Sequence, residues 1–157
     1  LYLCYVLRHK WFVFIECCKL GIPWLGVVHD LSKFKPNEFI TYANYFHSEE
    51  RRYLKREDKR GYYIPPDTGD FDFNYAWLKH QKNNKHHWQY WILIKSLDEI
   101  ICLPMPDKYR KEMLADWRGA NKAQGVKRSV KEWYLKYKHQ IHLHPETRKW
   151  IEEQLKI

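Results

Sequence analysis

The chain has 157 residues, which corresponds most simply to one domain. Its formal net charge is +9, with 28 Lys and Arg against 19 Asp and Glu, so we expect it to attract anions: nucleotides, nucleic acid or an acidic surface. Aromatic residues make up 17% of the chain, which favours a core of large rings. No apolar run reaches the roughly 18 residues of a membrane span, so no membrane interaction is expected.

The cysteines predict a reducing compartment. The chain has 4 cysteines and no C-x-x-C pair, and three of them lie in an apolar helical pattern. The apolar opening segment is interrupted by Arg8, His9 and Lys10 and is followed by no small-residue cleavage site, which argues against a signal peptide. We therefore expect a cytoplasmic protein.

Helical periodicity recurs along the chain and strand signals are nearly absent, so the predicted fold class is all-α, a single-domain helical bundle of roughly seven helices. The first predicted helix covers residues 2–20 and ends at Gly21. A short helix starts at Pro23, and another covers residues 36–50 with a proline in its first turn. The stretch "GYYIPPDTGD", residues 61–70, is the longest expected loop and a candidate lid.

In the second half of the chain we expect helices over residues 72–82, 86–102 and 106–118. The stretch "GANKAQG", residues 119–125, is interpreted as a basic surface loop. Ser129 and Glu132 form a capping-box pattern at the start of a helix over residues 129–141. Pro145 begins the last predicted helix, residues 145–156.

The stretch "GVVHDLSKFKPNEF", residues 26–39, places His29 and Asp30 side by side after an apolar run. Burying such a pair without partners costs several kcal/mol. One explanation is that Asp30 is the N-cap of a following helix. The alternative is that both residues bind a metal ion.

Further histidines and one aspartate fall on apolar faces of the predicted helices: His9, His80, His86, His87 and Asp116. A single inward histidine is usually a satisfied core residue, and a single buried aspartate is often paired with Lys or Arg. Convergence of all these residues on a cation would satisfy every one of them. Imidazole and carboxylate ligands suit Mn, Fe, Co or Zn, so we expect a divalent transition-metal site.

The ordered set His9, His29-Asp30 and Asp116 resembles the HD-domain metal-dependent phosphohydrolases, which are named for an adjacent His-Asp pair. "HDLSKF", with Lys33 three residues after the aspartate, is similar to the H-D-x-G-K signature of the HD-GYP phosphodiesterase branch, with Ser32 in place of the glycine. The further histidines fall in the interval where that branch also has some. "AWLKH", "NKHHWQYW" and "EMLADW" look like segments of small phage and bacterial proteins of this kind. The resemblance covers roughly residues 6–118.

This resemblance implies an HD-like helical domain with one or two divalent transition-metal ions (Mn, Fe, Co or Zn). The implied ligands of the first ion are His9, His29, Asp30 and Asp116. The implied ligands of the second ion are Asp30, His80 and His87, with His86 as a substitute for either histidine. Lys33 would stabilise charge on the phosphate or orient the nucleophile, and an unligated His86 would protonate the leaving oxygen. Glu38 is a further candidate acid or base.

The implied reaction is hydrolysis of a nucleotide phosphoester bond, most specifically in a cyclic nucleotide or cyclic dinucleotide. The alternatives are a 5′-nucleotidase, a degenerate domain that binds a nucleotide without cleaving it, and a non-enzymatic module for RNA or single-stranded DNA. Such a module gives no reason for the inward histidines. The oligomeric state stays open, and the cytoplasm would be the host's if the chain is phage-encoded. The candidate substrate-binding residues are Lys79, Lys82, Asn84, Lys85, Trp88 and Arg118.

Overall fold

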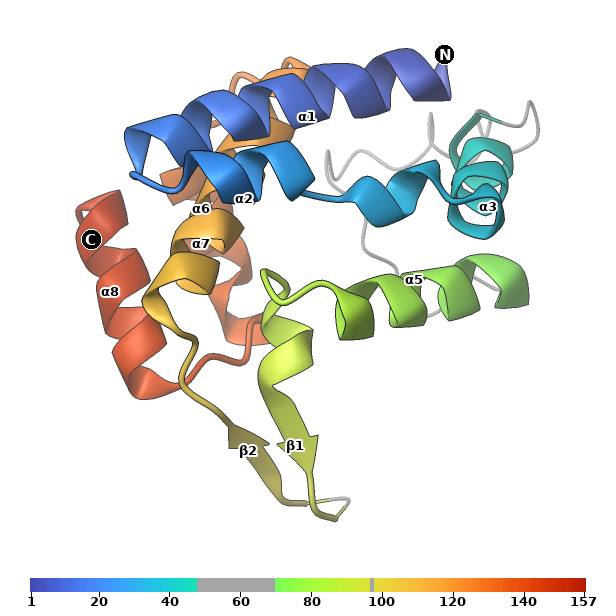
Figure 1. Cartoon of the computed structure of the whole chain (residues 1–157). Coiled ribbons are helices and arrows are strands. Elements are labelled where there is room, and N and C mark those ends of the chain that lie inside the picture. Colours follow the sequence, from blue (N-terminus) through green and yellow to red (C-terminus); the bar gives the residue numbers. More distant parts are fainter. Residues whose placement is uncertain (48–69, 97) are drawn as a thin grey trace.

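The structure is a computed structural model that describes residues 1–47, 70–96 and 98–157. The described residues are mainly helical, with one small antiparallel sheet, so the all-α prediction is confirmed. The long helices are α1 (Tyr2–Lys19), α3 (Pro36–His47), α5 (Phe71–Asn83), α6 (Asp107–Gln124) and α8 (Pro145–Leu155). The shorter elements are α2 (Pro23–Val28), η1 (Leu31–Phe34), η2 (Trp88–Trp91), β1 (Ile92–Ile94), β2 (Ile100–Cys102), α7 (Val130–Tyr137) and η3 (Lys138–Gln140) (Figure 1).

Helices α1 and α6 pack against each other, and α2 packs against α1. Gly119 allows α6 to approach α1 closely, because a Cβ at this position would lie 2.4 Å from Cγ2 of Val13 and 2.8 Å from its backbone nitrogen. Helix α3 packs on α5 at the other end of the molecule (Figure 1). Close packing of α1 on α6 sets His9 opposite Asp116, whose side chains meet across the two helices.

Among the residues that the structure describes, the apolar core is divided into three clusters. The largest joins Met113 and Leu114 of α6 to residues of α7 and α8, such as Tyr134 and Ile151. A second, rich in aromatic rings, joins the start of α1 to α3 and α5, and a third lies between α1 and α6. His9 follows Val6 of the second cluster and precedes Val13 of the third along α1. Buried polar residues therefore lie between separate apolar cores.

The prediction of a helix over residues 86–102 is wrong. His86 and His87 precede the single turn η2, and a hairpin follows, in which Ile92 pairs with Cys102, Leu93 with Ile101 and Ile94 with Ile100. Periodicity cannot separate helix from strand in short apolar runs such as "WILI" and "IIC". Their isoleucines favour extended structure, and the polar residues between the two runs allow the chain to reverse.

The remaining helix boundaries differ in two places. Helix α6 continues through the predicted basic loop to Gln124 and ends at Gly125, whose φ of 66° is left-handed. The predicted 129–141 helix is split into α7 and η3, although its capping box, Ser129 with Glu132, is confirmed. The candidate lid, up to residue 69, and the end of the predicted 36–50 helix lie outside the described residues.

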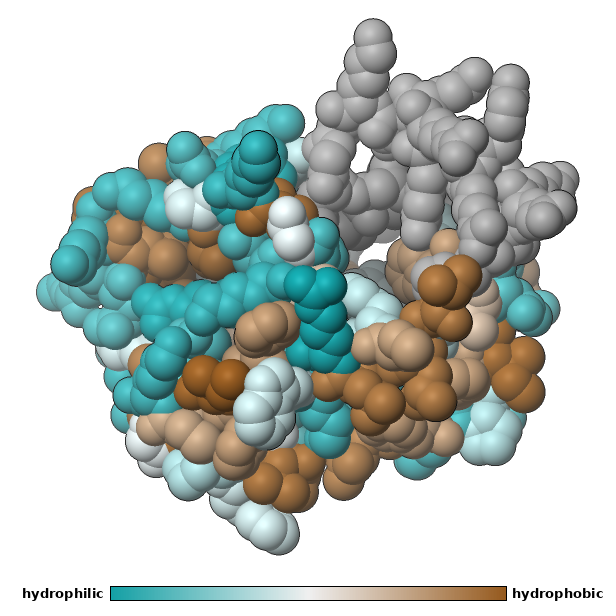
Figure 2. Space-filling model, turned by 90° about the horizontal axis from the view of Figure 1, so that it is seen from above, coloured by the Kyte–Doolittle hydropathy of each residue, from teal (hydrophilic) through white to brown (hydrophobic). Residues whose placement is uncertain are grey.

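The face that α1 and α2 present to solvent is mixed in character. Figure 2 shows brown apolar residues lying among teal hydrophilic ones. The exposed apolar side chains of these two helices include Leu3, Leu7, Trp11, Trp24 and Val27. In the described part of the chain no helix is both long and apolar enough to cross a membrane.

Candidate metal centre

The His-Asp pair lies in the tight connection between α2 and η1. Asp30 has a left-handed backbone, with φ 53° and ψ 28°. Few residues other than glycine adopt this conformation, and aspartate and asparagine tolerate it better than most. Asp30 is the N-cap residue of η1, but its side chain makes no capping hydrogen bond, so capping does not account for the buried carboxylate. Lys10 of α1 donates from Nζ to the carbonyls of Val27 (2.6 Å) and His29 (2.8 Å), and thereby holds the end of α2.

One oxygen of Asp30 belongs to a first cluster with His9, His29 and Asp116. His9 Nε2 lies 3.1 Å from Asp116 Oδ1 and 3.7 Å from Asp30 Oδ2. His29 Nε2 lies 3.3 Å from Asp30 Oδ2 and 3.5 Å from Asp116 Oδ1. The structure thus brings together the four predicted ligands of the first ion from α1, the α2–η1 connection and α6.

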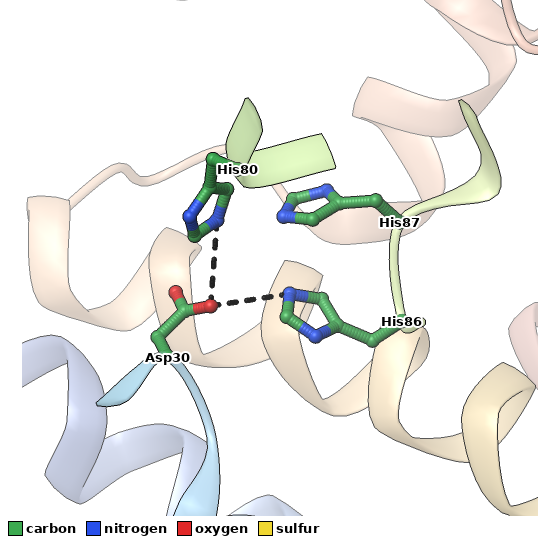
Figure 3. Close-up of side chains that lie close together, drawn as sticks. All are labelled: Asp30, His80, His86 and His87. Carbon is green, nitrogen blue, oxygen red and sulfur yellow. Dashed lines mark ion pairs between the residues drawn. The ribbon is translucent and has the colours of Figure 1, made fainter. Parts of the chain in front are cut away.

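The other oxygen of Asp30 faces a second cluster, formed with His80, His86 and His87. Asp30 Oδ1 lies 3.4 Å from His80 Nε2 and 3.4 Å from His86 Nε2. Figure 3 shows the rings of all three histidines turned toward the space beside Asp30. His80 comes from α5, and the adjacent pair comes from the connection after it. The three histidines among which the sequence left the ligands of the second ion open therefore all converge on one carboxylate.

These atoms are buried and find no hydrogen-bond partner among the described residues: Nε2 of His9, His29, His80, His86 and His87, and both carboxylate oxygens of Asp30. Each such atom costs about 1–3 kcal/mol when left unsatisfied. Two ligands at about 2.1 Å from one ion lie roughly 3.0–3.4 Å apart at octahedral or tetrahedral angles. The shortest separations in both clusters fall in or close to that range, so the donor set fits divalent transition metals.

Two glutamates, the buried Glu112 and the half-buried Glu38, lie behind the histidines, and sequence reasoning missed this role of both. Glu112 Oε1 lies 3.0 Å from His29 Nδ1 and 3.4 Å from His86 Nδ1. Glu38 contacts Nδ1 of His80. Metal-binding histidines commonly donate their second nitrogen to a carboxylate, which orients the ring. For Glu112 the available signal was its position one helical turn before Asp116 on the same face of α6.

The electrostatic environment keeps the carboxylates of the centre ionised. Burial alone would raise the pKa of Asp30, but His29, Lys33 and His80 hold that pKa well below its usual value. Lys33 Nζ lies 2.6 Å from Asp30 Oδ2. Burial likewise opposes ionisation of Asp116, and the nearby imidazoles of His29 and His9 hold its pKa well below the ordinary range.

The pKa values of His29 and His87 are shifted in opposite directions. Burial would lower the pKa of His29, but Asp30, Asp116 and Glu112 raise it well above its usual value. Burial, together with the neighbouring His86 and His80, lowers the pKa of His87 well below its usual value. Metal ligands must be deprotonated, so His87 is already in the form that binds a cation, whereas His29 must release a proton on binding.

The predicted substrate-binding residues contact other side chains and backbone groups of the chain. The charged groups of Lys79 and Lys85 lie over tyrosine rings, and Lys82 donates to the carbonyl of Gln89. Trp88 packs against the C-terminal core, and Arg118 faces Glu16 at 3.8 Å.

Asn84 supports the site rather than facing its centre. Its Nδ2 donates to the His80 carbonyl (2.8 Å) and to Ser32 Oγ (3.3 Å). We therefore assign Asn84 to the support of His80, in the α5 C-terminal turn.

A pocket opens beside Asp116, which is the more exposed carboxylate of the centre, at 16% against 3% for Asp30. Its aromatic walls are Trp117 and Trp133, whose ring centroids are 5.1 Å apart. The other residues that line it are Ala120, Asn121, Gln124, Val126, Arg128 and Val130. The pocket therefore combines flat apolar walls with amide and guanidinium groups next to the metal-binding side chains.

Comparison with known proteins adds a family but no activity. No curated protein and no solved structure matches the chain. One family matches residues 1–157, and its description is "Family of unknown function (DUF5662)". Because the match covers the entire chain described above, with both clusters of histidines and aspartates, the chain belongs to this family, DUF5662.

Proposed function

We propose that the chain is a metal-dependent phosphohydrolase that cleaves a phosphoester bond of a nucleotide. The observation that carries the proposal is the convergence of seven buried ligand atoms on the two sides of Asp30, none of which makes a hydrogen bond to a described residue. Asp30 Oδ2 also lies 2.6 Å from Lys33 Nζ. A core without an ion would leave the desolvation of these ligand atoms uncompensated. His9, His29, Asp30 and Asp116 would hold one ion, and Asp30, His80, His86 and His87 the second.

Two divalent ions, when bound, make a water molecule nucleophilic near neutral pH and neutralise phosphate charge. The chain's own contribution to the reaction is positional and electrostatic. Lys33, at the rim of the centre and 16% exposed, would place its ammonium group against the non-bridging phosphate oxygens. His86 lies between Asp30 and Glu112, as His29 does. This arrangement favours metal binding over proton donation for His86. Its acid role remains a prediction from the resemblance.

The pocket beside Asp116 supports a nucleotide as the substrate. Trp117 and Trp133, which pack edge to face, would give a base an aromatic surface to contact. Asn121, Gln124 and Arg128 offer hydrogen-bonding groups for the edge of a base or for phosphate. The net charge of +9 adds a long-range attraction for such an anion. Two ions favour phosphodiesters, with cyclic nucleotides and cyclic dinucleotides as the first candidates.

The test combines metal content with hydrolysis. We would supply Mn, Fe, Co or Zn to the wild type and to Asp30→Asn, remove free metal and measure metal per chain. Because the two oxygens of Asp30 face different clusters, we expect about two ions in the wild type and loss of both in the variant. Asp107→Asn is the matched control, since this aspartate begins the same helix as Asp116 but its side chain is 52% exposed.

Hydrolysis is then compared between bis(4-nitrophenyl) phosphate and 4-nitrophenyl phosphate, before cyclic dinucleotides and nucleoside monophosphates. We expect the diester to be cleaved faster. About one ion per chain, with preference for the monoester, would favour the 5′-nucleotidase alternative. No bound ion under any of these conditions would contradict the proposal and leave the basic nucleic-acid-binding module.

A further inference from the structure

We propose that Glu112 is a positioning residue shared by both ion positions, so that this one side chain sets the affinity of the centre for both ions. The inference rests on the metal centre of the proposed function and extends it to a residue that binds neither ion. It starts from a single atom, since one oxygen of Glu112 faces Nδ1 of His29 and Nδ1 of His86.

The two histidines belong to different clusters. His29 Nε2 faces Asp30 Oδ2 and Asp116, whereas His86 Nε2 faces Asp30 Oδ1. Their ring centroids are only 4.4 Å apart, so one carboxylate can reach both rings from behind. Glu112 is 5% exposed and lies four residues before Asp116 on α6. The same helix face therefore provides a ligand of one cluster and the support of both.

The shared oxygen selects the tautomer of both rings. A carboxylate oxygen accepts hydrogen bonds, so each Nδ1 must carry the proton that it donates to Glu112. In a neutral ring the other nitrogen, Nε2, then presents its lone pair toward Asp30. Both Nε2 atoms are buried and lack a hydrogen-bond partner within the described ranges 1–47, 70–96 and 98–157. Glu112 thus fixes ring orientation and donor atom in the two clusters at once.

Glu38 gives a built-in comparison. It contacts Nδ1 of His80, whose Nε2 faces only the Oδ1 side of Asp30, and therefore supports a histidine of the second cluster alone. If the carboxylates behind the rings control the affinity for metal ions, the two glutamates must differ in the number of ions that they affect. Removal of Glu38 should weaken one ion, and removal of Glu112 should weaken both.

Glu112, His29 and His86 are also close enough to hold a cation themselves. In that arrangement each histidine would have to bind ions through both nitrogens, and its Nδ1 could not donate a proton to the carboxylate. The Nε2 atoms of His29 and His86 instead face Asp30, at 3.3 and 3.4 Å. The geometry therefore favours support over ligation for Glu112.

The test measures zinc binding to the metal-stripped full chain by titration calorimetry and elemental analysis, with wild type, Glu112→Gln and Glu38→Gln compared. We expect both dissociation constants to rise about 10- to 100-fold in Glu112→Gln, and only one of them to rise in Glu38→Gln. Circular dichroism in chelator checks that each variant is folded. A general loss of packing would not distinguish the two glutamates in this manner.

A second measurement needs no variant. In the zinc-loaded wild type, nitrogen chemical shifts of the imidazoles should show Nδ1 protonated and Nε2 coordinated for both His29 and His86. Coordination through Nδ1 would overturn the inference. Equal affinity of Glu112→Gln and the wild type for both ions would also overturn it. Loss of one ion in Glu112→Gln, with normal binding of the other, would overturn it as well, because Glu112 would then be a ligand.

The outcomes separate this inference from the proposed function. Two ions in the wild type with unchanged affinities in Glu112→Gln would remove only the role of Glu112. Two ions with the expected pattern but no phosphoester hydrolysis would support the role of Glu112 and contradict the proposed reaction. A wild type that binds no ion would overturn both.

Discussion

Glu16 of α1 is a buried carboxylate outside the metal centre. Its side chain is 4% exposed and accepts hydrogen bonds from Lys122 (2.6 Å) and Lys19 (2.7 Å). Burial alone would raise the pKa of Glu16, but the two lysines outweigh burial and hold that pKa below its usual value. The lysine ammonium groups remain partly in water, so most of the desolvation falls on the glutamate. Glu16 therefore links the C-terminal ends of α1 and α6 by charge.

Glu16→Gln should lower the free energy of unfolding by roughly 1–3 kcal/mol at pH 7, as expected for loss of hydrogen bonds to charged groups. A carboxylate with a depressed folded-state pKa contributes stability above its unfolded-state pKa and loses it as pH falls through the folded-state value. The gap between wild type and variant should therefore close below about pH 4. Urea denaturation at several pH values, with the exposed Glu153→Gln as control, measures this. A gap that persisted at low pH would contradict the assignment.

At the scale of elements, α6 does more than any other helix to organise the site. It carries Asp116, Glu112 and the aromatic wall Trp117, and its packing on α1 depends on Gly119. A helix interior normally disfavours glycine by roughly 1 kcal/mol relative to alanine. Here the missing side chain is what lets the two backbones approach. The distance between His9 and Asp116 depends on that approach.

Gly119→Ala should therefore destabilise the fold by roughly 1–3 kcal/mol through overpacking against Val13, despite the better helix propensity of alanine. It should also weaken metal binding, because α1 and α6 would move apart at His9 and Asp116. Thermal unfolding and zinc titration would measure the two effects. Gly125→Ala is the matched control at the end of the same helix. Its φ of 66° makes alanine unfavourable, but no atom lies within 4 Å of the added Cβ. That variant should lose stability and keep its metal affinity.

At the scale of the whole molecule, the candidate ligands join parts of the chain that share no continuous apolar core. They come from α1, the α2–η1 connection, α5, the connection after α5, and α6. The apolar clusters on either side are separate. A bound cation would therefore connect α1, α5 and α6, and would stabilise the folded state by an amount set by its free concentration relative to its dissociation constant.

Chelation should lower the melting temperature of the metal-loaded protein. An ion at a free concentration of 100 times its dissociation constant stabilises the folded state by about 2.7 kcal/mol. This corresponds to a rise in melting temperature of roughly 5–10 °C for a chain of this length. Thermal unfolding with and without EDTA measures the shift. Asp30→Asn should melt at the same temperature in both conditions, whereas Asp107→Asn should respond as the wild type does. An equal EDTA effect in Asp30→Asn would indicate that the stabilising ion binds elsewhere.

Much of the fold followed from local signals. The helix starts at Pro23, Pro36 and Pro145 agree with the structure, and so does the Ser129–Glu132 capping box. The failures occurred where local signals were ambiguous. A short isoleucine-rich run formed a hairpin, and a glycine read as part of a loop proved to be a packing residue inside α6. The hairpin arises from pairing between two neighbouring runs, whereas the packing of Gly119 on Val13 is a contact between distant parts of the chain.

Some features of the candidate site could likewise be predicted from the sequence, and others could not. The sequence alone determined the helical class and the set of histidines and aspartates that meet, because amphipathic periodicity and the order of motifs are properties of the chain. Only the tertiary structure decided that Asp30 turns one oxygen to each cluster, that His86 lies opposite Glu112, and that Trp117 and Trp133 rather than Trp88 stand beside Asp116. His29 and Glu112 are 83 residues apart, and no local pattern relates them. Packing of both α2 and α6 on α1 brings His29 and Glu112 together, and with them the arrangement that can hold ions.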